Sequence, residues 1–258
     1  MTTTTQTSNG VQSVDRVLDL LEFIAESGGA RSLSELAAVS GLPLPTIHRL
    51  LRTLTNRGYV RRLADRRYAL GPRLIPLGEG ATKQLGAVSH TILAGLVAEL
   101  GETANMAVLD GDMVTYIAQV PSTHSMRMFT EVGRRVHVHD TGVGKAILTL
   151  LGDETVRGIV TRVGMPTPTT TSHGSVDELL ADLAVSRERG YAIDDGEQEV
   201  GVRCFAVPVP DAPTPMAVSV SGPAQRVNEV FEERAVPLLK RAAREIAARM
   251  RESEREEG

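Results

Sequence analysis

Three apolar stripes with helical spacing, each interrupted by glycine or proline, constrain the first sixty residues to three short helices. The first stripe stops at Gly28. The second starts after Ser32, which forms a capping-box pattern with Glu35, and it stops at Gly41. The third follows Pro45, a residue suited to the first helical position. The stripes consist of Val14, Val17, Leu18, Leu21 and Ile24; Leu33, Leu36, Ala37 and Val39; and Ile47, Leu50, Leu51 and Leu54.

The third helix has a polar outer face, and a basic hairpin pattern follows it. When the apolar stripe faces the core, hydrogen-bond donors and guanidinium groups remain outside. Two short strand patterns at 59–62 and 67–70 bracket a tight turn at 63–66. This order predicts a winged helix-turn-helix domain over residues 11–71. The residues expected to contact DNA are Pro45, Thr46, His48, Arg49, Arg52, Thr53, Arg61, Arg62, Arg66 and Arg67.

Charge is distributed unevenly along the chain. The 258 residues carry a formal net charge of −4, yet residues 46–68 hold seven Arg against one acid, Asp65. Residues 1–71 carry +3, and the remaining residues carry −7. A solvated arginine-rich face is one explanation of such a patch. Its position on a helix-turn-helix pattern favours the other, an electrostatic footprint for double-stranded DNA.

Cysteine content and hydropathy exclude several classes of protein. A single cysteine, Cys204, cannot form an internal disulfide, which excludes a disulfide scaffold and is compatible with a reducing compartment. Residues 1–10 have neither a basic start nor an apolar run, so they predict a disordered tail and no signal peptide. No stretch reaches the ~18 apolar residues that a membrane span needs. We therefore expect a cytoplasmic protein without membrane association.

The pattern changes after residue 71. Residues 72–100 predict linker helices, because a helical stripe that ends at Gly101 follows a start interrupted by glycine and proline. Residues 101–252 predict a second, mixed α/β domain, and 253–258 a frayed tail. Within the second domain, strands are expected at 104–110, 113–119, 191–194, 202–209 and 216–221, and helices at 143–151, at 176–189 and at the C-terminus.

Two motifs in the second domain resemble ligand sites but lack essential members. The run 137–139 would place His137 and His139 on one face of a strand, but no third metal ligand stands at a telling spacing. The run 142–145 resembles a phosphate loop, but His139 and Ala146 stand where that loop needs Gly and Ser or Thr. We therefore expect no metal and no cofactor.

The loop 141–144 is a third candidate, because it leads into a helix. Small residues there would let a ligand carboxylate approach backbone N–H groups at the positive end of the helix dipole. An ordinary capped helix gives the same pattern, so the residues alone leave both interpretations open.

The whole chain resembles the IclR family of bacterial transcriptional regulators. The residues that carry the resemblance are 13–18, 33–37, 41–51 and 58–60, and the likeness continues to about residue 250. It implies an α/β (α+β) fold with an N-terminal winged helix-turn-helix, a linker helix and a C-terminal GAF-like effector-binding domain. It also implies homodimers or homotetramers that bind operator DNA and a small-molecule effector, and no enzymatic activity.

Within that family, residues 125–128, 190–194, 199–204 and 217–223 resemble the allantoin-pathway repressors. The resemblance implies a repressor of allantoin and purine-nitrogen catabolic genes, released by a small carboxylate such as allantoate or glyoxylate. Thr141 and Val143 depart from the pattern, in which Ser and Ala are more familiar. By resemblance, the effector would contact Thr141, Gly142, Val143, Gly144, Asp194, Cys204, Ser219 and Ser221.

Roles for these residues follow as expectations. Backbone N–H groups of 142–144 would hold a carboxylate, and the hydroxyls of Ser219 and Ser221, at i and i+2 on a strand, would donate to ligand oxygens. Asp194 would accept a hydrogen bond, and Cys204 would line the wall. An activator or a sensor of an aromatic acid remains open. An enzyme using Cys204 or Asp194 is a remote alternative, because no set of nucleophile, base and orienting group is visible.

Overall fold

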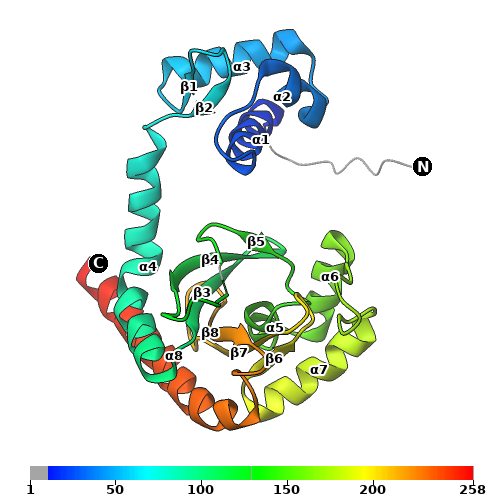
Figure 1. Cartoon of the computed structure of the whole chain (residues 1–258), viewed down its shortest axis with the longest axis vertical. Helices are drawn as coiled ribbons and strands as arrows, with labels where there is room; N and C mark the ends of the chain where they lie inside the picture. The colour runs from blue at the N-terminus through cyan, green and yellow to red at the C-terminus, as the bar shows by residue number, and fades with distance from the viewer. Residues whose placement is uncertain (1–10, 129, 258) are drawn as a thin grey trace. The chain divides into compact units, whose positions relative to one another are not determined.

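The computed structural model describes residues 11–128 and 130–257, so the expected N-terminal tail lies outside the described residues. Contacts divide the chain into two compact units on either side of 81/82, and each is described by itself (Figure 1). Among the described residues, no helix is long and apolar enough to cross a bilayer.

The first unit contains the three expected helices and the hairpin. Ser32 and Glu35 form the expected capping box, and Gly41 ends the second helix with a left-handed φ of 65°. Pro45 is the second residue of its helix, one position later than expected. The elements are α1 Gln12–Glu26, α2 Leu33–Ser40, α3 Leu44–Asn56, β1 Val60–Arg62 and β2 Tyr68–Leu70. Their shared core contains Leu20, Ile24, Leu36, Ile47, Leu51, Leu54, Val60 and Tyr68.

The segment after the hairpin is one helix, α4, which spans Leu74–Leu100. The sequence predicts an interrupted start there, because Pro76, Gly78 and Gly80 disfavour helix. Pro76 is the third residue of α4, where a backbone N–H has no partner inside the helix, so the proline removes no hydrogen bond. Gly101 follows the helix with a φ of +80°.

The second unit is built on an antiparallel sheet whose strand order is β5-β4-β3-β8-β7-β6. The strands are β3 Thr103–Asp110, β4 Met113–Val120, β5 Arg135–Val136, β6 Ala192–Asp195, β7 Val202–Pro208 and β8 Met216–Pro223. The helices are α5 Gly142–Leu148, α6 Asp153–Val163, α7 Val176–Arg189 and α8 Glu229–Glu257.

One face of this sheet carries large side chains, and the other carries small ones. Large residues such as Phe205 pack with α8 and the C-terminal part of α4 on one face (Figure 1). Neighbours such as Ala206 and Ala217 point to the other face, where α5, α6 and α7 pack. These small residues let α5 approach the sheet closely. A Cβ at Gly142 would lie 2.8 Å from Sγ of Cys204.

Differences from the sequence expectations are local. His137 and His139 were expected on a strand, but β5 ends at Val136, and both residues follow it. The strand is short because only 135–136 pair with β4. Helix α6 was not expected, and the strand expected around 137–139 lies at 135–136 as β5. Helix α8 continues through Glu257, where the sequence predicts fraying from 253.

Gly144→Ala should lower the free energy of unfolding by about 1–3 kcal/mol, because its Cβ would overpack the contact between α5 and the preceding loop. That Cβ would lie 2.4 Å from the carbonyl oxygen of Val138. Urea unfolding of both variants measures the effect. The control is Gly95→Ala in α4, whose Cβ meets nothing within 4 Å. It should stabilise the protein by about 0.4–1 kcal/mol. Equal effects at the two positions would contradict the close contact.

Candidate functional site

A basic surface covers α3 and the hairpin of the first unit. Ile47, Leu51 and Leu54 are buried, which turns the opposite face of α3 to solvent. All ten residues expected to contact DNA lie on this surface, with Thr46 half-buried. The other nine are exposed: Pro45, His48, Arg49, Arg52, Thr53, Arg61, Arg62, Arg66 and Arg67.

Hydrogen bonds within the hairpin fix two of its arginine side chains, Arg61 and Arg67. Arg66 occupies the turn with a φ of 69°, and the Arg67 Nε donates to Asp65 Oδ2 over 2.6 Å. That hydrogen bond lowers the pKa of the Asp65 carboxyl. Arg61 Nε donates to the Leu70 carbonyl oxygen over 3.3 Å. Guanidinium groups fixed in this way, beside an exposed helix face, can bind phosphates while the helix contacts base edges.

A second site is formed by polar residues in register across the central strands of the second unit. Asn105 on β3 pairs with Ser219 on β8. Ser221 on β8 pairs with Cys204 on β7, which pairs with Asp194 on β6. Because these residues share one face of the pleat, their side chains converge beneath the start of α5.

The site is a small, partly enclosed cavity of about 20 Å³. This volume has room for about one water molecule. The cavity brings together six of the eight residues expected to bind the effector: Thr141, Gly142, Asp194, Cys204, Ser219 and Ser221. The remaining lining residues are Asn105, Tyr116, Met128, Thr130, Gln198 and Val202.

Two expected residues do not line this cavity. Val143 is 1% exposed and packs in the core between α5 and the sheet. The Gly144 N–H donates to Thr141 Oγ1 over 3.1 Å, so the N-cap already satisfies it. Helix α5 has only seven residues, so its dipole contributes little. The polar groups that face the cavity therefore come from side chains more than the sequence predicts.

Hydrogen bonds fix the side chains on the floor of the cavity. Asn105 Nδ2 donates to Ser221 Oγ over 3.2 Å, and Gln119 Nε2 donates to Asn105 Oδ1 over 3.2 Å. The backbone N–H of Glu197 donates to Asp194 Oδ1 over 2.8 Å. These hydrogen bonds fix the orientation of the Asn105, Ser221 and Asp194 side chains towards the cavity.

Burial controls the charge of Asp194 and Cys204, two of the ionisable groups in the wall. Burial and the nearby Glu197 carboxylate raise the pKa of Asp194 to about 7. Burial, with a contribution from Asp194, raises the pKa of the Cys204 thiol to about 12. At neutral pH, Cys204 is therefore a thiol, without the thiolate that a nucleophile requires.

His137 and His139 contact each other, and among the residues that the structure describes no third metal ligand joins them. Their rings lie 5.5 Å apart in an edge-to-face arrangement. The His139 Nε2 lies 2.9 Å from the Pro166 carbonyl oxygen. Burial lowers the pKa of His139, so its neutral form is favoured.

Sequence reasoning missed Asn105 and Gln198 among the lining residues. Asn105 interrupts an otherwise apolar stretch of β3, which is a signal in the sequence. Its position opposite Ser219 depends on β3 pairing with β8, and the sequence does not show which strands are neighbours in the sheet. Gln198 lies in an irregular loop with no periodic signal.

Two family models match the chain. The "IclR helix-turn-helix domain" matches residues 13–64, and "Bacterial transcriptional regulator IclR C-terminal" matches residues 81–248. Together they support the fold class expected from the sequence, an N-terminal winged helix-turn-helix and a C-terminal GAF-like effector domain.

Curated relatives span nearly the whole chain. The "Transcriptional repressor IclR" of Escherichia coli K12 is 39% identical, over 92% of this chain and 89% of its own. The "Acetate operon repressor" of Salmonella typhimurium is 38% identical, over 95% and 92%. The "HTH-type transcriptional repressor AllR" of Escherichia coli K12 is 30% identical, over 92% and 90%.

A solved IclR regulator from Alicyclobacillus acidocaldarius has the same fold. The two chains are 30% identical with a TM-score of 0.83, over 93% of this chain and 98% of that one. The expectation of a regulator that is not an enzyme is confirmed by these matches. The chain belongs to the IclR family of bacterial transcriptional regulators, DNA-binding proteins that respond to a small-molecule ligand.

Proposed function

We propose that this regulator is a cytoplasmic repressor, active as a homodimer or homotetramer, and released from its operator by a small aliphatic carboxylate. The observation that carries the proposal is the cavity under α5, where Asn105, Ser219 and Ser221 offer hydrogen-bonding groups to one small volume. Serine hydroxyls and an amide N–H₂ suit carboxylate and carbonyl oxygens.

Glyoxylate is the effector that we place first, and allantoate second. The cavity of about 20 Å³ must widen for any ligand, and the smallest acid requires the least widening. The sequence also leaves open an aromatic acid, which would have to displace more of the wall, including Tyr116 and Met128. A thermal-shift panel of small aliphatic and aromatic acids, repeated with operator DNA, separates these ligands.

The target genes are proposed from two observations. The pattern of Asp194, Cys204, Ser219 and Ser221 supports allantoin and purine-nitrogen catabolic genes. The names of the more similar relatives, at 39% and 38% identity, favour another small-acid operon, such as an acetate operon. Sequencing of DNA recovered with the protein from cells distinguishes the two, and transcript levels of the bound genes with and without the protein show whether binding represses or activates.

Release from DNA requires differential binding. The regulator has one conformation that fits the operator and another that does not. The effector must bind the second conformation more tightly than the first. Such couplings are typically about 1–3 kcal/mol, or about 5–150-fold in affinity. The contacts to DNA are proposed for the exposed face of α3 in the major groove and for the hairpin arginines on flanking phosphates.

Arg49→Ala or Arg52→Ala should weaken binding to an operator selected from random DNA by about 1–3 kcal/mol, because each removes a guanidinium from the exposed face of α3. The effector-induced thermal shift should stay at its wild-type value. Fluorescence anisotropy and differential scanning fluorimetry measure the two quantities.

The control for these variants is Arg157→Ala, which removes one exposed guanidinium from α6 in the second unit. It should leave operator affinity within twofold of wild type. Wild-type affinity in both α3 variants would refute the proposed contact surface.

The double substitution Ser219→Ala and Ser221→Ala should leave operator affinity unchanged and abolish release by glyoxylate. Both hydroxyls line the cavity, far in sequence from the DNA-binding residues. Release is measured by titrating the effector into the preformed protein–DNA complex. A buried serine outside the cavity, Ser186 in α7, provides the control substitution Ser186→Ala. Release of the double variant at the wild-type effector concentration would count against this cavity as the site.

A further inference from the structure

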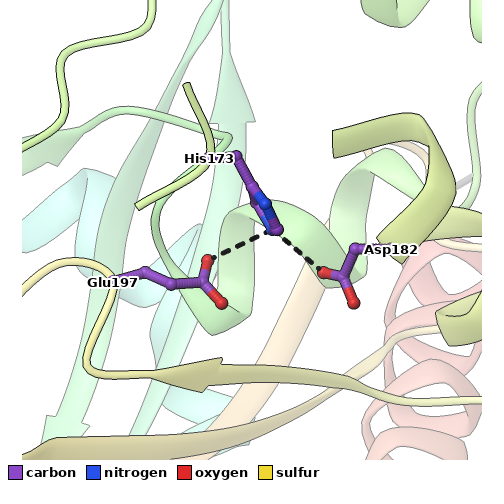
Figure 2. A group of neighbouring side chains, drawn as sticks. All are labelled: His173, Asp182 and Glu197. Atoms are coloured by element: carbon purple, nitrogen blue, oxygen red, sulfur yellow. Dashed lines mark ion pairs between the residues drawn. The ribbon is translucent and has the colours of Figure 1, made fainter. Parts of the chain in front are cut away.

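A second polar cluster lies outside the effector cavity, between α5, α7 and the loop after β6. Its members are Lys145 on α5, His173 before α7, Asp182 on α7 and Glu197 after β6. Figure 2 shows the His173 imidazole between the carboxylates of Asp182 and Glu197. Segments far apart in the sequence thus bring three potential metal ligands together.

Lys145 orients the two carboxylates. Its side chain is 1% exposed, and Nζ donates to Asp182 Oδ2 over 2.7 Å and to Glu197 Oε1 over 2.6 Å. The second oxygen of Glu197 is therefore turned towards His173, with Oε2 lying 3.6 Å from Nε2. The ammonium group fixes the carboxylates before any ligand arrives.

Two buried atoms at the centre of the cluster have no hydrogen-bond partner among the described residues. They are Nε2 of His173 and Oε2 of Glu197. The Glu197 side chain is only 8% exposed. A buried carboxylate oxygen without a partner is costly, so a missing ligand is a physical explanation for this one.

The distances between the candidate ligand atoms suit a metal ion with tetrahedral coordination. The His173 Nε2 lies 3.5 Å from Asp182 Oδ2 and 3.6 Å from Glu197 Oε2. The edge of a tetrahedron with zinc–ligand bonds of about 2.1 Å is roughly 3.4 Å. One candidate ligand atom from each of the three residues lies within 4.8 Å of the other two.

We propose that His173, Asp182 and Glu197 bind one divalent metal ion of the zinc class, with water as the fourth ligand. One nitrogen and two carboxylate oxygens form a donor set that zinc accepts. Lys145 stays as an outer contact on Glu197 Oε1, and on Asp182 Oδ2 it shares the ligand oxygen with the metal ion, so it orients both carboxylates. The sequence predicts no metal site, because 173, 182 and 197 have no characteristic spacing.

Charge also bears on the strength of this site. The two carboxylates carry two negative charges, and the buried ammonium of Lys145 compensates one of them, so one negative charge remains when His173 is neutral. Arg189 Nη2 lies 3.9 Å from Asp182 Oδ1, the oxygen that does not face His173. These two cations limit affinity, so we expect micromolar binding and no permanent structural ion.

Zinc titration of the full-length, tag-free protein, after treatment with a chelator, should show one equivalent bound in competition with a chromophoric indicator. His173→Ala and Asp182→Asn should each weaken binding tenfold or more, because each removes one ligand. His124→Ala, which removes an exposed histidine elsewhere, should bind as wild type does. Circular dichroism verifies that each variant is folded.

X-ray absorption at the zinc edge of the wild-type protein supplies a measurement that needs no variant. It should show nitrogen and oxygen ligands at about 2.0–2.2 Å, including one imidazole. A sulfur ligand would place the ion at Cys204 and overturn the proposal. Failure of the folded wild type to bind zinc at micromolar concentrations, or full binding by both variants, would also overturn it.

Discussion

The close contact between α5 and the central strands is the constraint on which the second unit depends. Gly142 and Gly144 leave no room for a Cβ, since one would lie 2.8 Å from Cys204 Sγ and the other 2.4 Å from the Val138 carbonyl oxygen. The alanines of β7 and β8 on the same face make this approach possible. Without it, the start of α5 would not cover the polar side chains of the sheet, and no enclosed cavity would form.

The same sheet separates stability from recognition. Its other face packs Phe205, Val218 and Val220 against α4 and α8 in an apolar core. The face beneath α5 includes Ser219 and Asn105, whose burial is tolerated because neighbouring strands provide hydrogen-bond partners. Alternation along single strands therefore assigns one set of residues to the apolar core and another to the wall of the polar cavity.

Much of the first unit could be predicted from sequence, because local signals determine it. The capping box at Ser32 and the left-handed Gly41 define α2, and the stripe from Ile47 to Leu54 determines which face of α3 is exposed. The cavity was only partly predictable. Ser219 and Ser221 share a face by their spacing, but Asn105 joins them through a pairing 114 positions away. The sequence left open whether the Gly144 N–H is capped by Thr141 or faces a ligand, because this depends on the Thr141 rotamer.

The small size of the cavity has a consequence for the rate of ligand binding. A volume of about 20 Å³ is smaller than any of the acids considered, so the wall must open before a ligand enters, and this step lowers the association rate. The free energy of opening also enters the apparent dissociation constant, because only the open fraction is competent to bind. Once closed over a ligand, the same wall slows escape. For an effector held in this cavity, opening of the same wall would therefore govern both entry and release.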